Sequence, residues 1–266
     1  MWFGRKKERP PTNEDVARRV IALRYVVTWA LGLGERVNPE KVKALPPERL
    51  VELRTATDSM RDTFWAELGP YRDELTSWER SFAETTMITI SERQLVDATW
   101  RIESFQVLLW AVGAVDDLPP WNQRADHSLA DPNFVAMGKK FFSLCKLRSR
   151  KELEQACSMA EVWHWRSRTR QLIEAGRTFE PSPAMTKAGL VSFDAIVRFT
   201  AKKLKESGEL TEIVDEDFAV GGKAYRDLSA EEFANVTSIT VERHFALNWL
   251  CGQAPENRWD ETPTGT

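Results

Sequence analysis

The chain has 266 residues, of which 42% are hydrophobic and 29% charged, and its 37 basic residues nearly balance 40 acidic ones. This composition is typical of a globular protein with a sizeable core and excludes a disordered or fibrous chain. A net charge of -3 gives no electrostatic reason for general affinity for nucleic acid, so no nucleic-acid partner is expected.

We expect the N-terminal region to carry no targeting or membrane segment. Residues 1–11 read as a basic tail, and the apolar run at 16–33 is interrupted by arginines, which excludes a signal-peptide core or a membrane span. The cysteines are odd in number and show no CxxC spacing, which favours free thiols in a reducing compartment: Cys145, Cys157 and Cys251. The sequence therefore predicts a cytoplasmic protein without a membrane partner.

Helix start signals recur along the chain. Thr12 and Asp15 resemble a capping box, and the helix that follows is expected to end near Gly32 or Gly34. A second helix starts at the proline pair 46–47 and ends near 69–70, and a short third one covers 71–84. The β-branched run "TTMITI" (85–90) is the best strand candidate.

Three clearer capping boxes follow, each a serine with Gln or Glu three residues later. They predict helices over 91–115, 149–176 and 229–252. A further helix over 192–207 is closed by Gly208. The intervening segments are rich in Asp, Pro, Gly and Ser and are interpreted as loops: 116–133, 177–191 and 209–228.

These elements predict a mainly α fold with at most one short strand or a small β element. After the tail at 1–11, we expect a single globular multi-helix domain over 12–266, because no long flexible linker divides it. An N-terminal helical subdomain over 12–85 is the alternative division.

Charged residues occur inside apolar helix faces at three places. On the predicted helix "SITVERHFALNWL" (238–250), Thr240, His244 and Asn248 form one polar stripe, whereas Glu242 and Arg243 fall in the apolar arc. Arg101 and Glu103 lie in the apolar half of the 91–115 helix, and Arg166 shares a face with Met159, Trp163 and Ile173. Such charges are rarely buried unpaired, because desolvation is costly.

We therefore predict that Arg101, Arg166 and Arg243 pair with Glu103 and Glu242 in one cluster between three packed helices. The full candidate polar cluster is Arg101, Glu103, Trp110, Trp163, Arg166, Glu242, Arg243, His244 and Asn248. A structural network is the favoured interpretation. The alternative is that surplus arginines in a Trp-lined pocket bind a carboxylate or phosphate. For His244, a structural hydrogen bond to the 217–228 segment is favoured over a general-base role.

Recognisable catalytic and metal-binding motifs are not found. "FAVGGKAYRDL" lacks the phosphate-loop pattern and is interpreted as a turn, and no serine or cysteine has the surroundings of a nucleophile. "RADHSLAD" has no diagnostic metal-ligand spacing. We expect no metal and no cofactor, and we lean against an enzyme.

Several stretches together resemble one bacterial family, the domain of unknown function 4272. They are residues 98–120, 147–168, 217–232 and 238–252, followed by "WDETPTGT". Trp259 and Asp260 match the C-terminal pattern of that family, and Gly265 stands where a later Asp is usual. The resemblance covers nearly the whole chain and implies a cytoplasmic helical domain. It carries no established activity, substrate or catalytic residues.

The resulting first hypothesis is a non-enzymatic protein-binding module, of a neutralising or adaptor type, that presents a Trp- and Arg-lined groove to a protein partner. The alternative is an enzyme or small-anion binder that uses an Arg-, His-, Glu- and Trp-lined pocket between helices. Geometry separates the two, because an enclosed cavity with free Arg and His groups favours the second hypothesis, and fully paired charges with an apolar surface favour the first. The sequence leaves the partner and the oligomeric state open.

Overall fold

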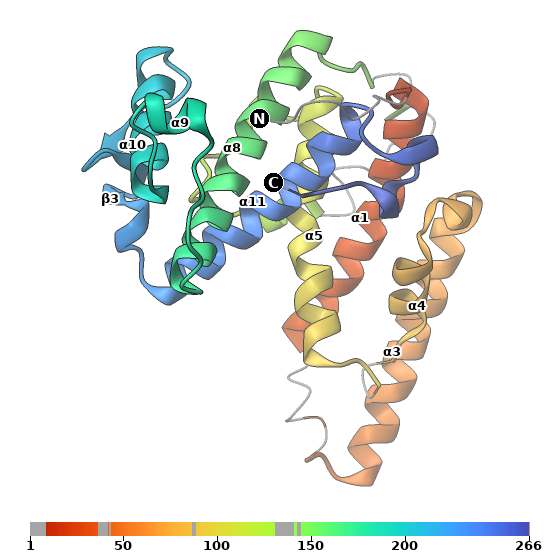
Figure 1. The fold of residues 1–266 in the computed structure, drawn as a ribbon. Coiled ribbons are helices and arrows are strands. Elements are labelled where there is room, and N and C mark those ends of the chain that lie inside the picture. Colours follow the sequence, from red (N-terminus) through yellow and green to blue (C-terminus); the bar gives the residue numbers. More distant parts are fainter. Residues whose placement is uncertain are drawn as a thin grey trace.

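Four helices packed in a row form the centre of the molecule (Figure 1). α1 (Asn13–Arg36) packs against α5 (Glu92–Ala111), α5 against α11 (Ala230–Leu250), and α11 against α8 (Arg150–Glu174). Helices distant in the chain are therefore neighbours in space. The computed structural model describes residues 9–36, 42, 44–86, 89–130, 141–142 and 145–265, so residues 1–8 of the basic tail lie outside it.

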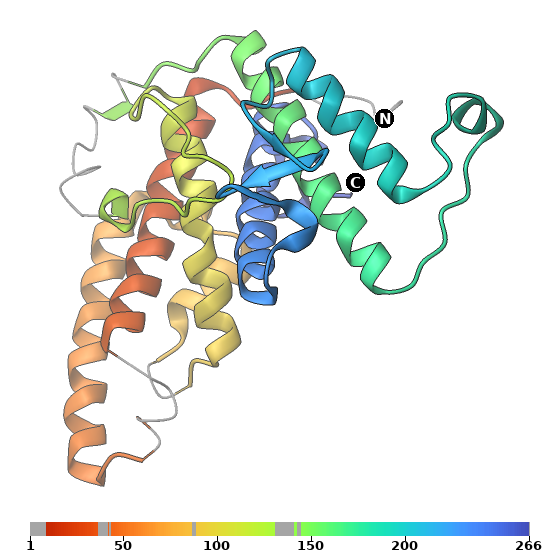
Figure 2. The same cartoon turned by 90° about the vertical axis from the view of Figure 1, so that its left-hand side faces the viewer.

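Further elements cover the two flanks of this row. On the outer side of α1 lie α3 (Pro47–Leu68), the 3-10 helix η1 (Gly69–Glu74) and α4 (Ser77–Glu84). Beside α8 lie α10 (Phe193–Glu206) and a small sheet, whereas α9 (Pro183–Lys187) lies in the projecting segment that joins α8 to α10 (Figure 2). The remaining 3-10 turns are η2 (His127–Ala130), η3 (Tyr225–Asp227), η4 (Pro255–Asn257) and η5 (Trp259–Glu261). The prediction of a mainly α fold with a small β element is confirmed.

The capping boxes predicted from the sequence are present. Side chain and backbone bond reciprocally between residues 91 and 94, 149 and 152, and 229 and 232. Thr12 and Asp15 make the same pair of bonds, at 2.8 and 3.2 Å. A further box at Thr76 and Glu79 opens α4. These reciprocal bonds satisfy backbone N–H groups that the first helical turn leaves unpaired.

Helix ends agree less closely with the sequence. α1 continues beyond the predicted glycines to Arg36, and α5 ends at Ala111 rather than near 115, because Gly113 takes a positive φ of 74° and turns the chain. α8 and α11 end two residues before Gly176 and Gly252, which have φ values of 64° and 73°. The prediction that these glycines close the two helices is confirmed.

The predicted strand at 85–90 is wrong in its described residues. The hydroxyl of Thr85 donates to the carbonyl of Phe82, and Thr86 and Thr89 bond to each other's backbone in a turn. Threonine hydroxyls thus compete with strand pairing here. Met87 and Ile88 lie outside the described residues.

The sheet lies instead in the 209–228 segment, for which the loop prediction is wrong. β1 (Ile213–Val214), β2 (Asp217–Val220) and β3 (Lys223–Ala224) are antiparallel in this order. Residues 215–216 and 221–222 all have positive φ, which is the geometry of tight two-residue hairpin turns. Strands of two to four residues are too short to show the alternation of apolar and polar residues by which a strand is predicted. The loop predicted at 177–191 likewise contains α9, and that predicted at 116–133 contains η2, with residues 131–133 outside the description.

Two groups of buried apolar side chains support this architecture. The larger group fills the space between α1, α3, α5 and α11, and the smaller one, which includes Trp163, Phe218 and Tyr225, lies between α8, the sheet and α11. Arg19 on α1 and Glu79 on α4 make a buried ion pair at the edge of the larger group. Among the described helices, none combines the length and apolarity required to cross a membrane.

Candidate functional site

Two charges that the sequence places in the apolar faces of neighbouring helices form a buried ion pair. Arg243 on α11 is 1% exposed and Glu103 on α5 is 0% exposed, and the guanidinium Nε lies 3.0 Å from a carboxylate oxygen. Burial lowers the pKa of Arg243, and Glu103 opposes that change. The second carboxylate oxygen accepts the backbone N–H of Ala125 at 2.8 Å. The prediction that Arg243 pairs with one of the two glutamates, Glu103 or Glu242, is confirmed.

The remaining donors of Arg243 hold the loop that follows α5. One terminal nitrogen donates to the carbonyl oxygens of Pro119 and Pro120, at 2.6 and 3.2 Å, and the other to that of Gln123 at 2.7 Å. Proline has no N–H, so its carbonyl is the only backbone group that can anchor such a segment. The buried guanidinium therefore fixes the loop that carries Trp121.

A second ion pair, Arg101 with Glu242, lies at the same interface of α5 and α11 and agrees with the predicted pairing of the arginines with the two glutamates. One terminal nitrogen of Arg101 is 3.1 Å from both carboxylate oxygens, and the hydroxyl of Ser104 donates to Glu242 at 2.8 Å. Burial raises the pKa of Glu242, against the opposing effects of Arg101 and Ser104. The side chain of Arg101 is 25% exposed, so this pair is partly solvated.

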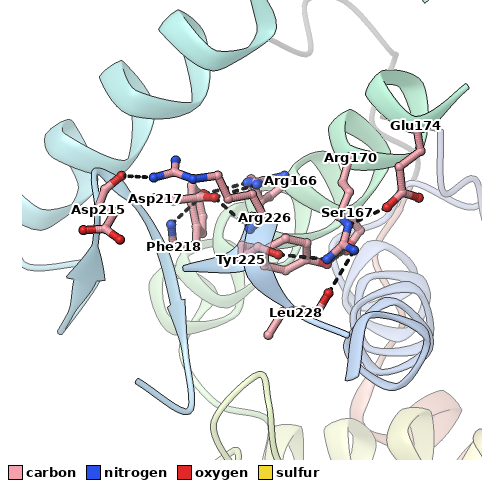
Figure 3. A network of polar contacts seen from close by, with 10 residues as sticks. All are labelled: Arg166, Ser167, Arg170, Glu174, Asp215, Asp217, Phe218, Tyr225, Arg226 and Leu228. Atoms are coloured by element: carbon pink, nitrogen blue, oxygen red, sulfur yellow. Dashed lines mark hydrogen bonds and ion pairs between the residues drawn. The ribbon is translucent and has the colours of Figure 1, made fainter. Parts of the chain in front are cut away.

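Arg166 does not join this cluster, and the prediction that it would is wrong. It binds Asp217 on β2 through two parallel hydrogen bonds of 2.8 and 2.6 Å, with both side chains buried (Figure 3). Asp217 also accepts the backbone N–H groups of Phe218 and Arg226. Its carboxylate thereby fixes β2 to α8 and to the turn after β3. Asp217 was not predicted as a partner because its strand lies in a segment interpreted as a loop.

The network around Arg166 extends along α8 (Figure 3). Arg170 donates to the carbonyl oxygens of Tyr225 and Leu228, at 3.0 Å each, and also pairs with Glu174. The hydroxyl of Ser167 lies 2.6 Å from that of Tyr225. These polar bonds therefore attach the hairpin and η3 to α8, together with the packing of Trp163 on Phe218 and Tyr225.

His244 contacts another histidine rather than the 217–228 segment, so the predicted loop contact is wrong. Its Nδ1 lies 2.9 Å from Nδ1 of His164, and its Nε2 lies 3.0 Å from the amide nitrogen of Asn248. Burial lowers the pKa of His164 and lowers that of His244 to about 3. Asn248 also binds the carbonyl of Pro263 and the thiol of Cys157. Both ring nitrogens of His244 are thus occupied in a neutral, structural network.

A groove with a volume of about 590 Å³ opens between the loop fixed by Arg243 and the hairpin fixed by Arg166. We call it the Trp121 groove. Trp121 stacks on Trp163 of α8, with ring centroids 5.9 Å apart and planes inclined by 19°. The groove is lined by residues 118–122 on one side, by Ala156, Met159 and Trp163 below, and by 209–212, Ala219, Gly221 and Gly222 on the other side.

The charges around the Trp121 groove have one sign. Glu209 and Glu212 are the charged residues among those that line it, and both are exposed. The tip of the β2–β3 hairpin approaches the opposite loop closely, because a Cβ on Gly221 would lie 3.8 Å from the side chain of Asn122. The groove is therefore an apolar, aromatic channel with an acidic border.

The sequence prediction included one residue of this groove, Trp163. Trp110 lies elsewhere, at the end of α5 under the guanidinium of Arg148, 4.9 Å from its ring centroid. Trp121, Asp217 and the two border glutamates were missed. The prolines before Trp121 were the available signal, since they restrict the loop that presents the ring.

The candidate cluster contains no metal site. Within the ranges that the structure describes, no group of three His, Cys, Asp or Glu side chains is arranged to hold an ion. In the "RADHSLAD" stretch, Asp126 and His127 are exposed, and Asp131 lies outside the described residues.

Comparison with known proteins yields one match. The family model for a domain of unknown function (DUF4272) matches residues 2–177. The chain belongs to this family. No curated protein and no solved structure matches.

The part matched by the DUF4272 model is structurally incomplete by itself. It contains Glu103, Trp121 and Arg166, whereas their partners Arg243 and Asp217 lie beyond residue 177. α11, which packs between α5 and α8, is also outside the matched residues. Residues beyond the matched range thus supply the hairpin side of the Trp121 groove and the helix between α5 and α8 in this DUF4272 member.

Proposed function

We propose that this protein is a non-catalytic binding module that holds an extended, basic segment of a partner polypeptide in the Trp121 groove. The observation that carries the proposal is the groove itself, in which Trp121 stacks on Trp163 between two walls that are each anchored by a buried ion pair. Rigid aromatic surfaces lose little conformational entropy on binding, because their side chains are already ordered before the partner binds.

The chemistry of the groove defines the segment that fits it. Apolar side chains and the half-buried ring of Trp121 favour proline and aliphatic residues, which pack on aromatic surfaces in extended conformations. Glu209 and Glu212 on the border favour lysine or arginine in the partner. A volume of about 590 Å³ accommodates a few side chains, so the groove is suited to a short linear segment.

The alternative of an enzyme or anion binder built on the predicted cluster has weaker support. Arg243 directs its donors to protein acceptors, Arg166 is held by two bonds to Asp217, and His244 is neutral with both nitrogens in contact. A pocket of about 330 Å³ does adjoin Arg101, but it is lined by the carboxylates of Asp97 and Glu242 as well. One guanidinium facing two carboxylates offers an anion no net attraction.

The proposed setting is the cytoplasm of a bacterium. The three cysteines form no disulfide with one another, as in proteins of reducing compartments, and the family resemblance supplies the bacterial assignment.

A random peptide display library selected on the purified protein tests this function. We expect retained peptides to be enriched in Pro, aliphatic and Lys or Arg residues, and to weaken as salt increases. Trp121→Ser should abolish their binding, and Trp65→Ser, on the remote helix α3, should leave it unchanged. Failure to retain any peptide, or equal binding to the Trp121→Ser variant, refutes the proposal.

A further inference from the structure

In the described part of the chain, four arginines are almost completely buried, and three of them face a carboxylate. These pairs are Arg19 with Glu79, Arg166 with Asp217 and Arg243 with Glu103. The fourth, Arg24 on α1, is 7% exposed, and its Nε has no acceptor among the described residues. No described carboxylate forms an ion pair with it. Burying a guanidinium without a counter-charge is unfavourable, so this residue requires an explanation.

Arg24 lines a cavity of about 270 Å³ between α1 and α3. The cavity walls are mainly aromatic: Phe64 contacts Tyr25 edge-on at 5.5 Å and Trp29 at 5.8 Å between ring centroids. Met60 completes the apolar part. The indole N–H of Trp29 is also buried without an acceptor among the described residues. One wall thus combines a cation and an unpaired N–H donor with an apolar enclosure.

We propose that this cavity binds a small organic monocarboxylate with an aromatic or branched aliphatic body. The carboxylate accepts hydrogen bonds from Arg24, whose planar guanidinium matches its geometry, and the body packs on the rings of Tyr25, Trp29 and Phe64. Glu67 at the rim is exposed and repels a second negative charge, which disfavours dianions such as phosphate esters. The volume suits a ligand of about the size of an amino acid.

This site is independent of the proposed function. The cavity belongs to α1 and α3, whereas the Trp121 groove belongs to α8, the 118–122 loop and the hairpin. Loss of one is not expected to affect the other, so peptide binding to the Arg24→Met variant should equal that of the unmodified protein.

Isothermal titration of the full chain with 3-phenylpropanoate and with its neutral amide tests the assignment. We expect the acid to bind about tenfold or more tightly than the amide, because the amide leaves the guanidinium without a counter-charge. Arg24→Met should remove this preference. Arg18→Met, which changes an exposed arginine of the same helix, should retain it. Equal affinity for acid and amide, or an unchanged preference in Arg24→Met, overturns the proposal.

The stability of the Arg24→Met variant without ligand is a second, separate test. Removing an unpaired buried charge in favour of an apolar side chain should leave the melting temperature equal or higher. A lower melting temperature, or failure to fold, would show that Arg24 already has a counter-charge within the protein, and the proposed site would then be wrong.

Discussion

Replacement of Arg243 by methionine measures how much the buried ion pair contributes to folding. In this variant, Glu103 remains fully buried, and the N–H of Ala125 remains its hydrogen-bond donor. The carbonyl groups of Pro119, Pro120 and Gln123 lose their donors at the same time. Stranding one partner of a buried pair typically costs ~3–5 kcal/mol, a large share of the ~5–15 kcal/mol that holds a domain folded.

Urea denaturation followed by far-UV circular dichroism gives this free energy. The matched control is Arg49→Met, because Arg49 makes a surface pair with 69% of its side chain exposed and should lose no more than ~0.5 kcal/mol. The double variant Arg243→Met with Glu103→Gln should recover part of the loss, since it leaves no isolated charge. A loss for Arg243→Met as small as that of the control, or a double variant no better than the single one, would refute the reasoning.

Three further outcomes are expected in the same denaturation assay. Arg101→Ala should lose ~1–2 kcal/mol, less than Arg243→Met, because the Arg101–Glu242 pair is partly solvated; an equal loss would contradict this difference. Asp217→Asn should lose ~3–5 kcal/mol, because it leaves the buried guanidinium of Arg166 without its counter-charge, and it should also weaken peptide binding. A loss below about 1 kcal/mol would show that the network is dispensable. Burial lowers the pKa of His164 and lowers that of His244 to about 3. Below about pH 6.5 the unfolded chain therefore binds more protons than the folded one. The free energy of unfolding should then decrease on acidification by up to ~1.4 kcal/mol per pH unit for each histidine. His244→Gln should reduce that slope, and an unchanged slope would assign the pH dependence to other groups.

The helices were predictable because their signals are local. A capping box occupies four consecutive residues, and a glycine that closes a helix acts within its own turn, so both are visible in the sequence alone. The hairpin was not predictable by the same route. Its strands have two to four residues, and its first turn uses Asp215 and Glu216 at positive φ, where glycine or asparagine would have been the recognisable signal. Gly221 and Gly222 of the second turn did indicate a turn, but strands this short beside it gave no signal.

The ion pairs were predictable only where both partners lie on helices that the sequence reveals. Helical periodicity shows which charges lie in apolar faces and predicts that Arg101 and Arg243 pair with Glu103 and Glu242, but it does not say which arginine binds which glutamate. Arg166 lay in the same kind of face, but its partner Asp217 is in a strand that the sequence did not reveal. The contact between His164 and His244 could not be predicted either, since it depends on how α8 packs on α11.

The buried charges specify the position of the groove more than they add stability. Well-packed apolar residues often match or exceed a buried ion pair in stability, so stability alone does not account for these charges. A guanidinium can instead bind a carboxylate and several carbonyl groups at once, which no apolar side chain can do. Arg243 thereby fixes one loop and Arg166 one hairpin, and the distance between those two segments is the width of the Trp121 groove. If the groove binds a partner, variants that replace either arginine by a well-packed apolar residue should lose partner binding even where their stability is restored.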